Sequence, residues 1–255
     1  MAVDSGAPFL LDLQLLRDRV PSFADYPFCL PAVRHLQTLT FHPRVTFLVG
    51  ENGSGKSTLL EAIAVACDLN PEGGSRNFNF ATRASHSGLD RYVRLARSPR
   101  LPRDSFFLRA ESFYNVATEI ERLDKEPGGP PLILSYGGRS LHEQSHGESF
   151  FALFEHRFGG PGLYLLDEPE AALSPSRQMS FLALLHQHCQ AGSQFLIATH
   201  SPIIMAYPHA WIYVLGTEGP VRTDYTNTEH YRITRAFLTR TEKMLAVLLE
   251  TEEKA

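Results

Sequence analysis

An eight-residue segment near the start of the chain constrains the fold more than any other feature. It runs from Gly50 to Ser57 and reads Gly-Glu-Asn-Gly-Ser-Gly-Lys-Ser, which fits the pattern G-x-x-x-x-G-K-[ST]. It follows the apolar run Val45–Val49 and precedes Thr58–Leu69, where apolar residues recur at helical spacing. A strand, a glycine-rich loop and a helix in this order place backbone N–H groups and a helix N-terminus around phosphate oxygens.

The side chains of this loop predict nucleotide chemistry. Lys56 is expected to reach the β- and γ-phosphates, and the Ser57 hydroxyl is expected to ligate Mg²⁺. We expect Lys56 to be partly exposed before a nucleotide binds. An ordinary glycine-rich turn between a strand and a helix is the alternative. The other expected phosphate-binding positions around Lys56 and Ser57 are Glu51, Asn52, Gly53, Ser54, Gly55 and Thr58.

A second apolar run, Leu163–Leu166, leads directly into Asp167 and Glu168. Adjacent residues of a strand point to opposite sides, so the two carboxylates should have different roles. We expect Asp167 to hold Mg²⁺. We expect Glu168 to act as the general base that polarises the attacking water. A solvated acidic turn after a strand is the alternative interpretation.

A third apolar run, Phe195–Ala198, is followed by Thr199 and His200. A histidine at this position can hydrogen-bond a γ-phosphate or an attacking water, and it counts here as a catalytic candidate. A lone histidine at a strand end more often caps a helix or faces solvent. The order of the three segments along the chain favours the catalytic interpretation.

Taken together, these segments resemble the ATP-binding-cassette (ABC) ATPase superfamily of P-loop NTPases. The resemblance is strongest to its soluble SMC/RecF-like members and to short prokaryotic ATPases of the AAA/ABC type, and it spans roughly residues 36–213. It implies an α/β fold in which a mainly parallel sheet is flanked by helices and carries a small helical subdomain. The alternation of apolar runs and helical stretches is typical of such a sheet. In that family Gly50–Ser57 is the Walker A motif and Asp167–Glu168 ends the Walker B motif.

The expected organisation is a single ABC-type ATPase domain over residues 1–255. An irregular insertion is expected at about 71–103, because this stretch is rich in Gly, Ser, Asn and Arg and has weak periodicity. A helical subdomain with the family's signature motif is expected at about 111–160. C-terminal helices are expected at about 228–253, where apolar residues recur at helical spacing.

The resemblance also implies a signature motif, typically Leu-Ser-Gly-Gly-Gln, shortly before the Walker B strand. The segment Ser145-His146-Gly147-Glu148 begins 22 residues before Asp167 and matches it in part. Ser145 and Gly147 would then bind the ATP held by the other subunit of a head-to-tail dimer. The alternative is a serine N-cap with a capping-box glutamate three residues later.

The sequence departs from the family in one region. No glutamine occurs between Ser57 and Glu143, where the family places one on the loop that joins the core to the helical subdomain. Glu111 is the best positional substitute and a candidate contact for Mg²⁺ or water, with an ordinary helix-start acid as the alternative. Tyr26 and Phe28 are candidates for stacking on adenine, with core packing as the alternative.

Composition limits the partners and the compartment. The chain has 24 Lys and Arg against 28 Asp and Glu, which argues against a broadly basic nucleic-acid surface. It has no apolar stretch of about 18 residues and no basic N-terminal region, so neither a membrane span nor a signal peptide is expected. Three widely spaced cysteines favour a reducing compartment, and the expected location is cytoplasmic.

One local charge feature leaves a nucleic-acid partner open. The stretch comprises Arg91, Arg94, Arg97, Arg100, Arg103 and Arg109. It could bind nucleic-acid phosphates, or it could form a solvated face or surround the bound nucleotide.

The function that these observations favour is Mg²⁺-dependent hydrolysis of ATP to ADP and phosphate. A dimer that sandwiches the nucleotides would drive a conformational switch in an unknown protein partner. Two alternatives stay open. One is an ATP-gated interaction module that dimerises on nucleotide and hydrolyses slowly, and the other is the ATPase subunit of an ABC transporter.

Overall fold

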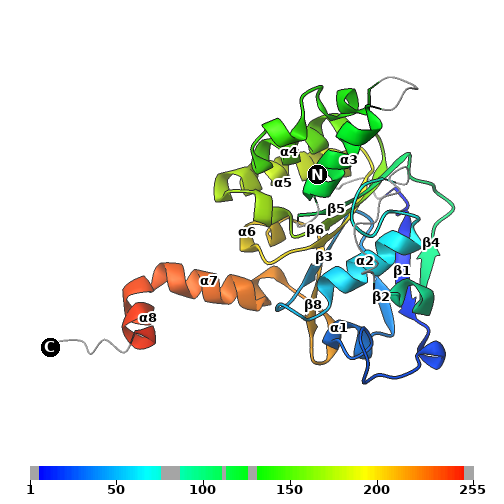
Figure 1. The fold of residues 1–255 in the computed structure, drawn as a ribbon. Coiled ribbons are helices and arrows are strands. Elements are labelled where there is room, and N and C mark those ends of the chain that lie inside the picture. Colours follow the sequence, from blue (N-terminus) through cyan, green and yellow to red (C-terminus); the bar gives the residue numbers. More distant parts are fainter. Residues whose placement is uncertain (1–5, 76–86, 111–112, 126–130, 250–255) are drawn as a thin grey trace.

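A six-stranded sheet in the order β5-β6-β7-β3-β8-β9 forms the centre of the molecule (Figure 1). The computed structural model describes residues 6–75, 87–110, 113–125 and 131–249. Five neighbouring strands are parallel, and only the edge strand β9 runs antiparallel to its neighbour. The strands are β3 (Val45–Val49), β5 (Asp104–Arg109), β6 (Gly162–Asp167), β7 (Gln194–Ala198), β8 (Trp211–Gly216) and β9 (Gly219–Thr223).

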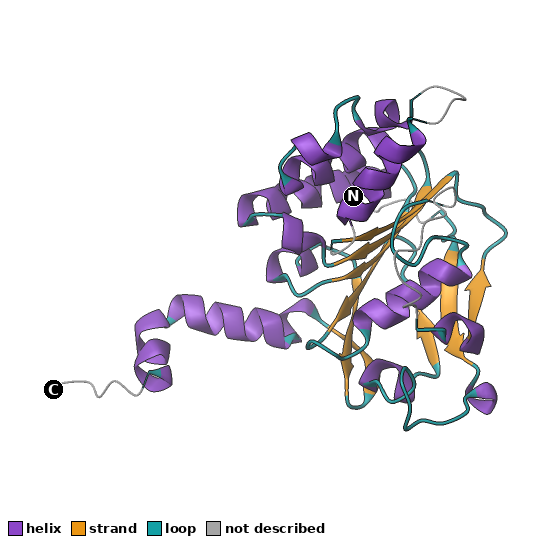
Figure 2. Cartoon of the chain, in the orientation of Figure 1, coloured by secondary structure: helices purple, strands orange, loops and turns teal. Residues whose placement is uncertain are grey.

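Helices and a second, smaller sheet cover the two faces of this sheet (Figure 2). Helix α2 (Lys56–Ala66) packs on one face, with the antiparallel sheet β2-β1-β4 beyond it. The other face carries α3 (Phe113–Leu123), α4 (His146–Ala152), the π-helical turn η5 (Leu153–Arg157), α5 (Pro175–Gln190) and α6 (Pro202–Met205). The predicted α/β class with a mainly parallel sheet is therefore confirmed.

The shorter elements connect these layers. The strands of the small sheet are β1 (Leu10–Leu15), β2 (Thr38–Thr40) and β4 (Val93–Arg97). The short helices are α1 (Pro31–Arg34), η1 (Arg17–Arg19), η2 (Leu89–Tyr92), η3 (Leu132–Tyr136), η4 (Leu141–Glu143), η6 (Pro169–Ala172) and η7 (Tyr225–Asn227).

The central strands are apolar on both faces because both faces are covered. Along β3, Phe47 faces the cluster under α5 and η5, whereas Leu48 faces the cluster under α2. Along β6, Tyr164 and Leu165 divide between the two clusters in the same way. This explains why the strands read as continuous apolar runs in the sequence, as the runs that became β3, β6 and β7 do.

A buried glutamine joins the N-terminal strand to the main sheet. Gln194, at the start of β7, accepts hydrogen bonds from the backbone N–H groups of Phe9 and Leu10, both at 2.9 Å. Its amide nitrogen donates to the carbonyls of Leu10 and His42 at 2.9 and 3.1 Å. Because all its hydrogen-bonding capacity is used, this fully buried side chain fixes the small sheet against the large one.

The expected irregular insertion at about 71–103 is wrong for its second half. Residues 89–97 form η2 and β4, and β4 pairs with β1 over Val93–Arg97. The alternation of Val93, Arg94 and Leu95 is a strand signal, but only five residues carry it and Gly, Ser and Arg surround them. Residues 76–86 lie outside the described part of the chain.

Several arginines of the cationic stretch bond within the chain. Arg94 donates to Gln14 Oε1 at 2.6 Å, and Arg97 donates to the carbonyl of Ala66. Arg100 donates to the carbonyl of Ala7 at 2.9 Å, and Arg109 points inward to acidic groups described below. Arg94 and Arg97 lie on β4, Arg100 follows this strand and Arg109 ends β5.

The C-terminal helices α7 (Glu229–Thr239) and α8 (Thr241–Leu248) extend away from the body (Figure 1). Neither helix has a buried residue, whereas Thr228, directly before α7, is 1% exposed. The arm formed by α7 and α8 is therefore attached through the first turn of α7. Within the described residues, no helix is both long and apolar enough to cross a membrane.

His42 makes the folded state sensitive to acid. Its Nδ1 accepts the backbone N–H groups of Arg44 and Val45 at 3.0 and 3.1 Å. Burial lowers the pKa of His42 from 6.5 to about 4, and the charges of Arg222, Arg44 and His209 act in the same direction. Between these two values the unfolded chain binds a proton at this position that the folded chain does not, so stability falls as the pH falls.

We predict that His42→Asn reduces this acid sensitivity, because an asparagine Oδ1 can replace the Nδ1 acceptor but does not titrate. Urea unfolding between pH 7 and pH 4 measures the effect. The variant is expected to lose less unfolding free energy than the wild type across this range. Parallel curves for the two proteins would show that His42 does not carry the effect.

Candidate functional site

The ends of four parallel strands lie at one level and bring distant residues together. Arg109 pairs with Asp167, Asp167 with Ala198, and Ala198 with Leu48 in the strand register. The residues that follow this row leave the sheet at its carboxyl edge, where α/β proteins of this kind bind ligands. The phosphate loop, the paired carboxylates and His200 therefore meet at one edge, as the sequence predicts.

Lys56 lies inside the phosphate loop. Its Nζ donates to the carbonyls of Gly50 and Glu51 at 2.8 and 3.1 Å. The residue is 4% exposed, which corrects the expectation that it is partly exposed. Burial lowers the pKa of Lys56 below its ordinary value, while Glu168 and Asp167 raise it. The loop curls around the ammonium group and so shields it from solvent even without a nucleotide.

The loop requires glycine at two positions. Gly55 has φ +101°, and a Cβ there would lie 3.2 Å from the Cβ of Ala32. At Gly50 a Cβ would lie 2.6 Å from the carbonyl oxygen of Leu215, which is too close for any side chain. Ser54 Oγ is buried and has no hydrogen-bond partner among the residues that the structure describes. An unpaired buried hydroxyl in this loop is a group that a phosphate oxygen can satisfy.

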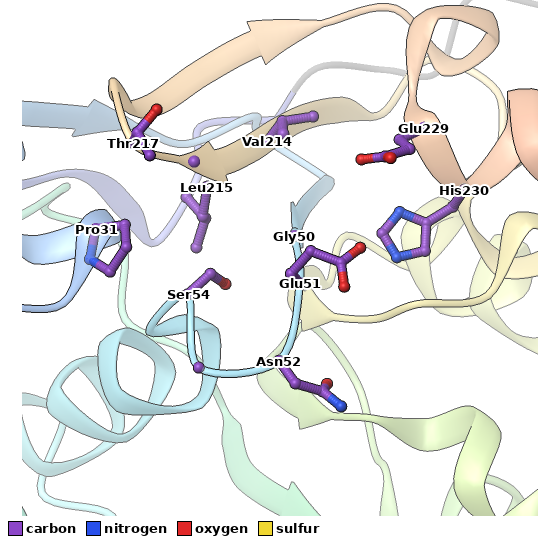
Figure 3. A pocket seen from close by; sticks show the side chains of 12 residues that line it. Pro31, Gly50, Glu51, Asn52, Ser54, Val214, Leu215, Thr217, Glu229 and His230 are labelled. Carbon is purple, nitrogen blue, oxygen red and sulfur yellow. The ribbon is translucent and has the colours of Figure 1, made fainter.

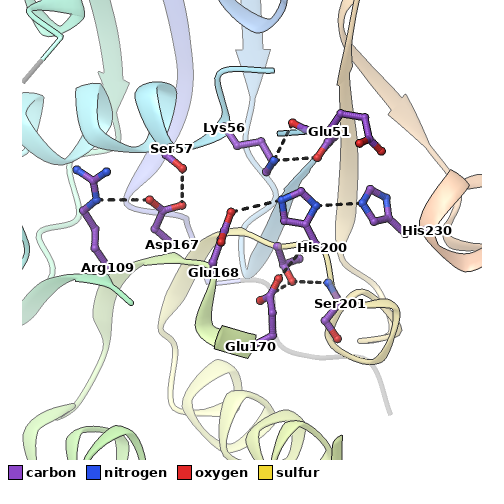
Figure 4. A network of polar contacts seen from close by, with 12 residues as sticks. Glu51, Lys56, Ser57, Arg109, Asp167, Glu168, Glu170, His200, Ser201 and His230 are labelled. Atoms are coloured by element: carbon purple, nitrogen blue, oxygen red, sulfur yellow. Dashed lines mark hydrogen bonds and ion pairs between the residues drawn. The ribbon is translucent and has the colours of Figure 1, made fainter. Parts of the chain in front are cut away.

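Asp167 is held by groups from two other elements (Figure 4). Ser57 Oγ donates to its Oδ1 at 3.0 Å, and Arg109 Nε lies 3.6 Å from its Oδ2. Arg109 also pairs with Glu61 of α2 at 3.0 Å. Two oxygen groups, the Ser57 hydroxyl and the Asp167 carboxylate, therefore converge at the end of the loop, and oxygen groups are the ligands that Mg²⁺ prefers.

Glu168 points away from Asp167 and toward His200. Its backbone is in the left-handed region, with φ 52°, an uncommon conformation for a residue with a side chain. Its backbone N–H donates to the carbonyl of Ala198 at 2.9 Å. Its side chain is 39% exposed, and Oε1 lies 3.3 Å from His200 Nε2. The two carboxylates thus have different surroundings, as their adjacent positions in the sequence predict.

His200 is fixed both through its backbone and through its ring. Glu170 accepts the His200 N–H at 2.5 Å and the Thr199 hydroxyl at 2.8 Å. On the ring, Nδ1 lies 3.1 Å from Nε2 of His230, the second residue of α7. Burial lowers the pKa of His200, and the charge of Lys56 lowers it further. The imidazole is therefore neutral at pH 7.

Two pockets flank the phosphate loop. One of about 220 Å³ is lined by Tyr26, Lys56, Ser57 and Glu168 among others. The second, of about 310 Å³, lies between the loop, the end of β8 and the first turn of α7, and it includes Glu51, Glu229 and His230 (Figure 3). Of the two aromatic candidates, Tyr26 is 62% exposed beside the loop, whereas Phe28 is buried against Tyr92 and is not available to a ligand.

The segment at Ser145 forms a complete capping box. Ser145 Oγ accepts the Glu148 N–H at 3.4 Å, and Glu148 Oε2 accepts the Ser145 N–H at 2.9 Å. Gly147 is buried under Arg177, and a Cβ there would lie 2.4 Å from a guanidinium nitrogen. The capping interpretation is confirmed, and it is compatible with a signature role because Ser145 stays exposed. Glu111, the candidate for the missing glutamine, lies outside the described residues.

Sequence reasoning missed three residues of this site. Arg109 was grouped with the cationic stretch, although its place directly after the apolar residues Phe106–Leu108 could have indicated an inward role. Glu170 lies two residues after the Walker B motif, and nothing in the sequence shows that it anchors His200. His230 lies within the expected C-terminal helices, and its contact with His200 across 30 residues leaves no local pattern in the sequence.

We predict that Arg109→Met lowers the free energy of unfolding by about 2 kcal/mol, because it leaves two largely buried carboxylates without their guanidinium. In a Glu61→Gln background the same change should cost less, since one of those charges is already gone. Chemical denaturation of the four proteins measures this coupling. Arg94→Met, which removes an exposed contact, is the control. Equal losses in both backgrounds would show that Arg109 and Glu61 do not interact.

Comparisons with known proteins agree with this geometry. A family model described as an AAA domain matches residues 27–122, and one described as an AAA domain, putative AbiEii toxin, Type IV TA system, matches residues 137–206. The cytochrome c biogenesis ATP-binding export protein CcmA of Mesorhizobium japonicum is 31% identical over 166 residues, which are 61% of this chain and 78% of that protein.

Two further matches extend over more of the chain. A putative ABC transporter ATP-binding protein of Streptomyces avermitilis is 27% identical over 84% of this chain, which spans only 39% of that protein. Among solved structures, MJ1267, an ATP-binding cassette of an ABC transporter, aligns with a TM-score of 0.51 and 14% identity, covering 92% of this chain and 97% of that one. Sequence relatives, the matched structure and the phosphate loop agree, and the chain belongs to the ABC-type ATPases of the P-loop NTPase fold.

Proposed function

We propose that this ABC-type ATPase hydrolyses ATP to ADP and phosphate with Mg²⁺, in a dimer that holds the nucleotides between its subunits. The observation that carries the proposal is the contact of the phosphate-loop Ser57 with Asp167, beside Glu168 and His200. The dimer would drive a conformational change in a protein partner. Tyr26, exposed beside the loop, is the residue we propose to stack on adenine.

The proposed binding roles follow from the contacts around the loop. Lys56 supplies the positive charge for the β- and γ-phosphates, and the backbone N–H groups of residues 51–58 with Ser54 Oγ supply neutral donors. The Ser57 hydroxyl and the Asp167 carboxylate fit Mg²⁺ and would hold it. When bound, Mg²⁺ neutralises charge on the phosphates.

The proposed hydrolytic roles belong to Glu168 and His200. Glu168 orients the attacking water and accepts its proton, for which its partly exposed carboxylate is suited. His200, neutral at pH 7, donates a hydrogen bond from Nε2 to the γ-phosphate or the water. Most of the rate enhancement then comes from positioning and charge stabilisation.

The proposed dimer is supported by the distance of the signature residues from the phosphate loop of their own chain. Among the described residues, neither pocket beside the phosphate loop is lined by Ser145 or Gly147. The rim of the loop, Glu51–Gly53, is exposed and leaves one face open to another chain. We propose that Ser145 and Gly147 of the second subunit approach this face. The capping box holds the exposed Ser145 in position for this contact, and the end of the Arg177 side chain lies over Gly147.

The partner of this dimer is a separate question. The names of the relatives favour a transporter subunit, whereas the arm of α7 and α8 offers exposed apolar side chains such as Leu238 and Val247 to a protein. We retain both as alternatives, together with an ATP-gated module that hydrolyses slowly. We also propose a cytoplasmic location, which three widely spaced cysteines, none of them in a disulfide, support.

We predict that Glu168→Gln binds Mg·ATP but hydrolyses it about 10²- to 10⁴-fold more slowly, because a general base is lost. The variant should form a stable dimer with ATP and Mg²⁺, seen by size-exclusion chromatography, and should be a monomer with ADP. A control with Ser145→Arg added should bind ATP but fail to dimerise, since Lys56 and Ser57 are intact. Wild-type hydrolysis by Glu168→Gln would contradict the assigned base.

A further inference from the structure

His230 reaches the hydrolytic site from the C-terminal arm. It is the second residue of α7, and its Nε2 lies 3.1 Å from Nδ1 of His200 (Figure 4). The first turn of α7 is held in place by neighbouring residues. Thr228 Oγ1 caps the helix by accepting the Tyr231 N–H at 3.3 Å, and the Tyr225 hydroxyl donates to the carbonyl of Pro202 at 2.9 Å. The helix cap at Thr228 and the contact of Tyr225 with Pro202 therefore hold the start of α7, and with it His230, beside His200.

The two nitrogens of the His200 ring face different partners. Nε2 is buried and lies 3.3 Å from Glu168 Oε1, although the two are not aligned as a hydrogen bond. Nδ1 faces His230 Nε2, and only one of these two nitrogens can donate the hydrogen between them. Because a neutral imidazole has one proton, the direction of this hydrogen bond determines which nitrogen of His200 carries it.

The surroundings favour one direction. If His200 Nδ1 donated to His230, the unprotonated Nε2 of His200 would lie 3.3 Å from Oε1 of the Glu168 carboxylate, and two electron-rich atoms would be in contact. If His230 Nε2 donates instead, the proton of His200 lies on Nε2, beside the Glu168 carboxylate. The pKa of His200, lowered by burial and by Lys56, keeps the ring neutral at pH 7, so this choice persists under ordinary conditions.

We propose that His230 is a positioning residue for His200: by donating its Nε2 hydrogen to His200 Nδ1, it keeps the His200 proton on Nε2. This inference rests on the proposed hydrolysis, in which His200 must donate from Nε2 to the γ-phosphate or the water. Because His230 belongs to α7, the proton position on His200 depends on where the first turn of the arm lies. The arm is thereby linked to the hydrolytic step.

Two variants of His230 separate this role from simple packing. His230→Phe keeps an aromatic ring but removes both nitrogens, whereas His230→Gln keeps an amide N–H near the position of Nε2. We expect kcat for ATP hydrolysis to fall about 10- to 100-fold in His230→Phe. This is the range seen in metal sites when a residue that orients a metal-binding histidine is lost. KM for ATP should stay unchanged, and His230→Gln should recover most of kcat.

The matched control is His186→Phe. His186 bonds the Tyr207 hydroxyl through Nδ1 at 3.1 Å and the Gln190 amide through Nε2 at 3.4 Å, so this change also removes ring-nitrogen hydrogen bonds, but outside the site. Its kcat should equal that of the wild type. Equal loss of kcat in His230→Phe and His230→Gln, or wild-type kcat in His230→Phe, would overturn the proposal.

A spectroscopic measurement decides the proposal independently of activity. The ¹⁵N shifts of the nucleotide-free protein, with His200 assigned by the His200→Gln variant, report which ring nitrogen is protonated. We expect a protonated Nε2 in the wild type and in His230→Gln, and a mixture of tautomers in His230→Phe. A protonated Nδ1 in the wild type would overturn the inference. Absence of ATP hydrolysis in the wild type would refute the proposed function, and the ¹⁵N shifts alone would then decide the role of His230.

Discussion

The common register of four parallel strands is the constraint on which the site depends. Leu48, Ala198, Asp167 and Arg109 lie in one row across β3, β7, β6 and β5. Backbone bonds continue the alignment beyond the row, from Thr199 N to Leu48 O at 3.1 Å and from Glu168 N to Ala198 O at 2.9 Å. A shift of one strand by one residue would turn its side chains to the other face. The separation of Asp167 from Glu168, and the approach of Glu168 to His200, follow from this register.

The two cations at this edge, Lys56 and Arg109, have partners without a ligand. Lys56 is buried against loop carbonyls, and Arg109 lies between the carboxylates of Asp167 and Glu61. A buried charge is costly unless it is paired or hydrogen-bonded, so these contacts stabilise an arrangement that would otherwise oppose folding. The same arrangement leaves Ser54 Oγ unpaired and the Glu168 side chain partly exposed, and both are free to meet a nucleotide and water.

Local patterns in the sequence predicted the central part of this structure. The strands that end at Val49, Asp167 and Ala198 were found because each is a continuous apolar run, and the phosphate loop because its spacing is fixed. The small sheet was missed because β2 has only three residues, β1 and β4 mix polar with apolar residues, and the strands pair only across long separations. The contacts of Arg109 and His230 were also missed, because they join residues that are far apart in the sequence and meet only in the folded chain. Lys56 proved more buried than expected because the loop wraps around it.

The central claim is that a second chain completes each hydrolytic site. The specific ATPase activity per subunit, measured across a range of protein concentrations with sedimentation in the same buffer, tests it most directly. If two subunits share each site, activity per subunit rises with concentration as monomers become dimers and then levels off. Constant activity per subunit, in a range where sedimentation shows a monomer throughout, would contradict the account.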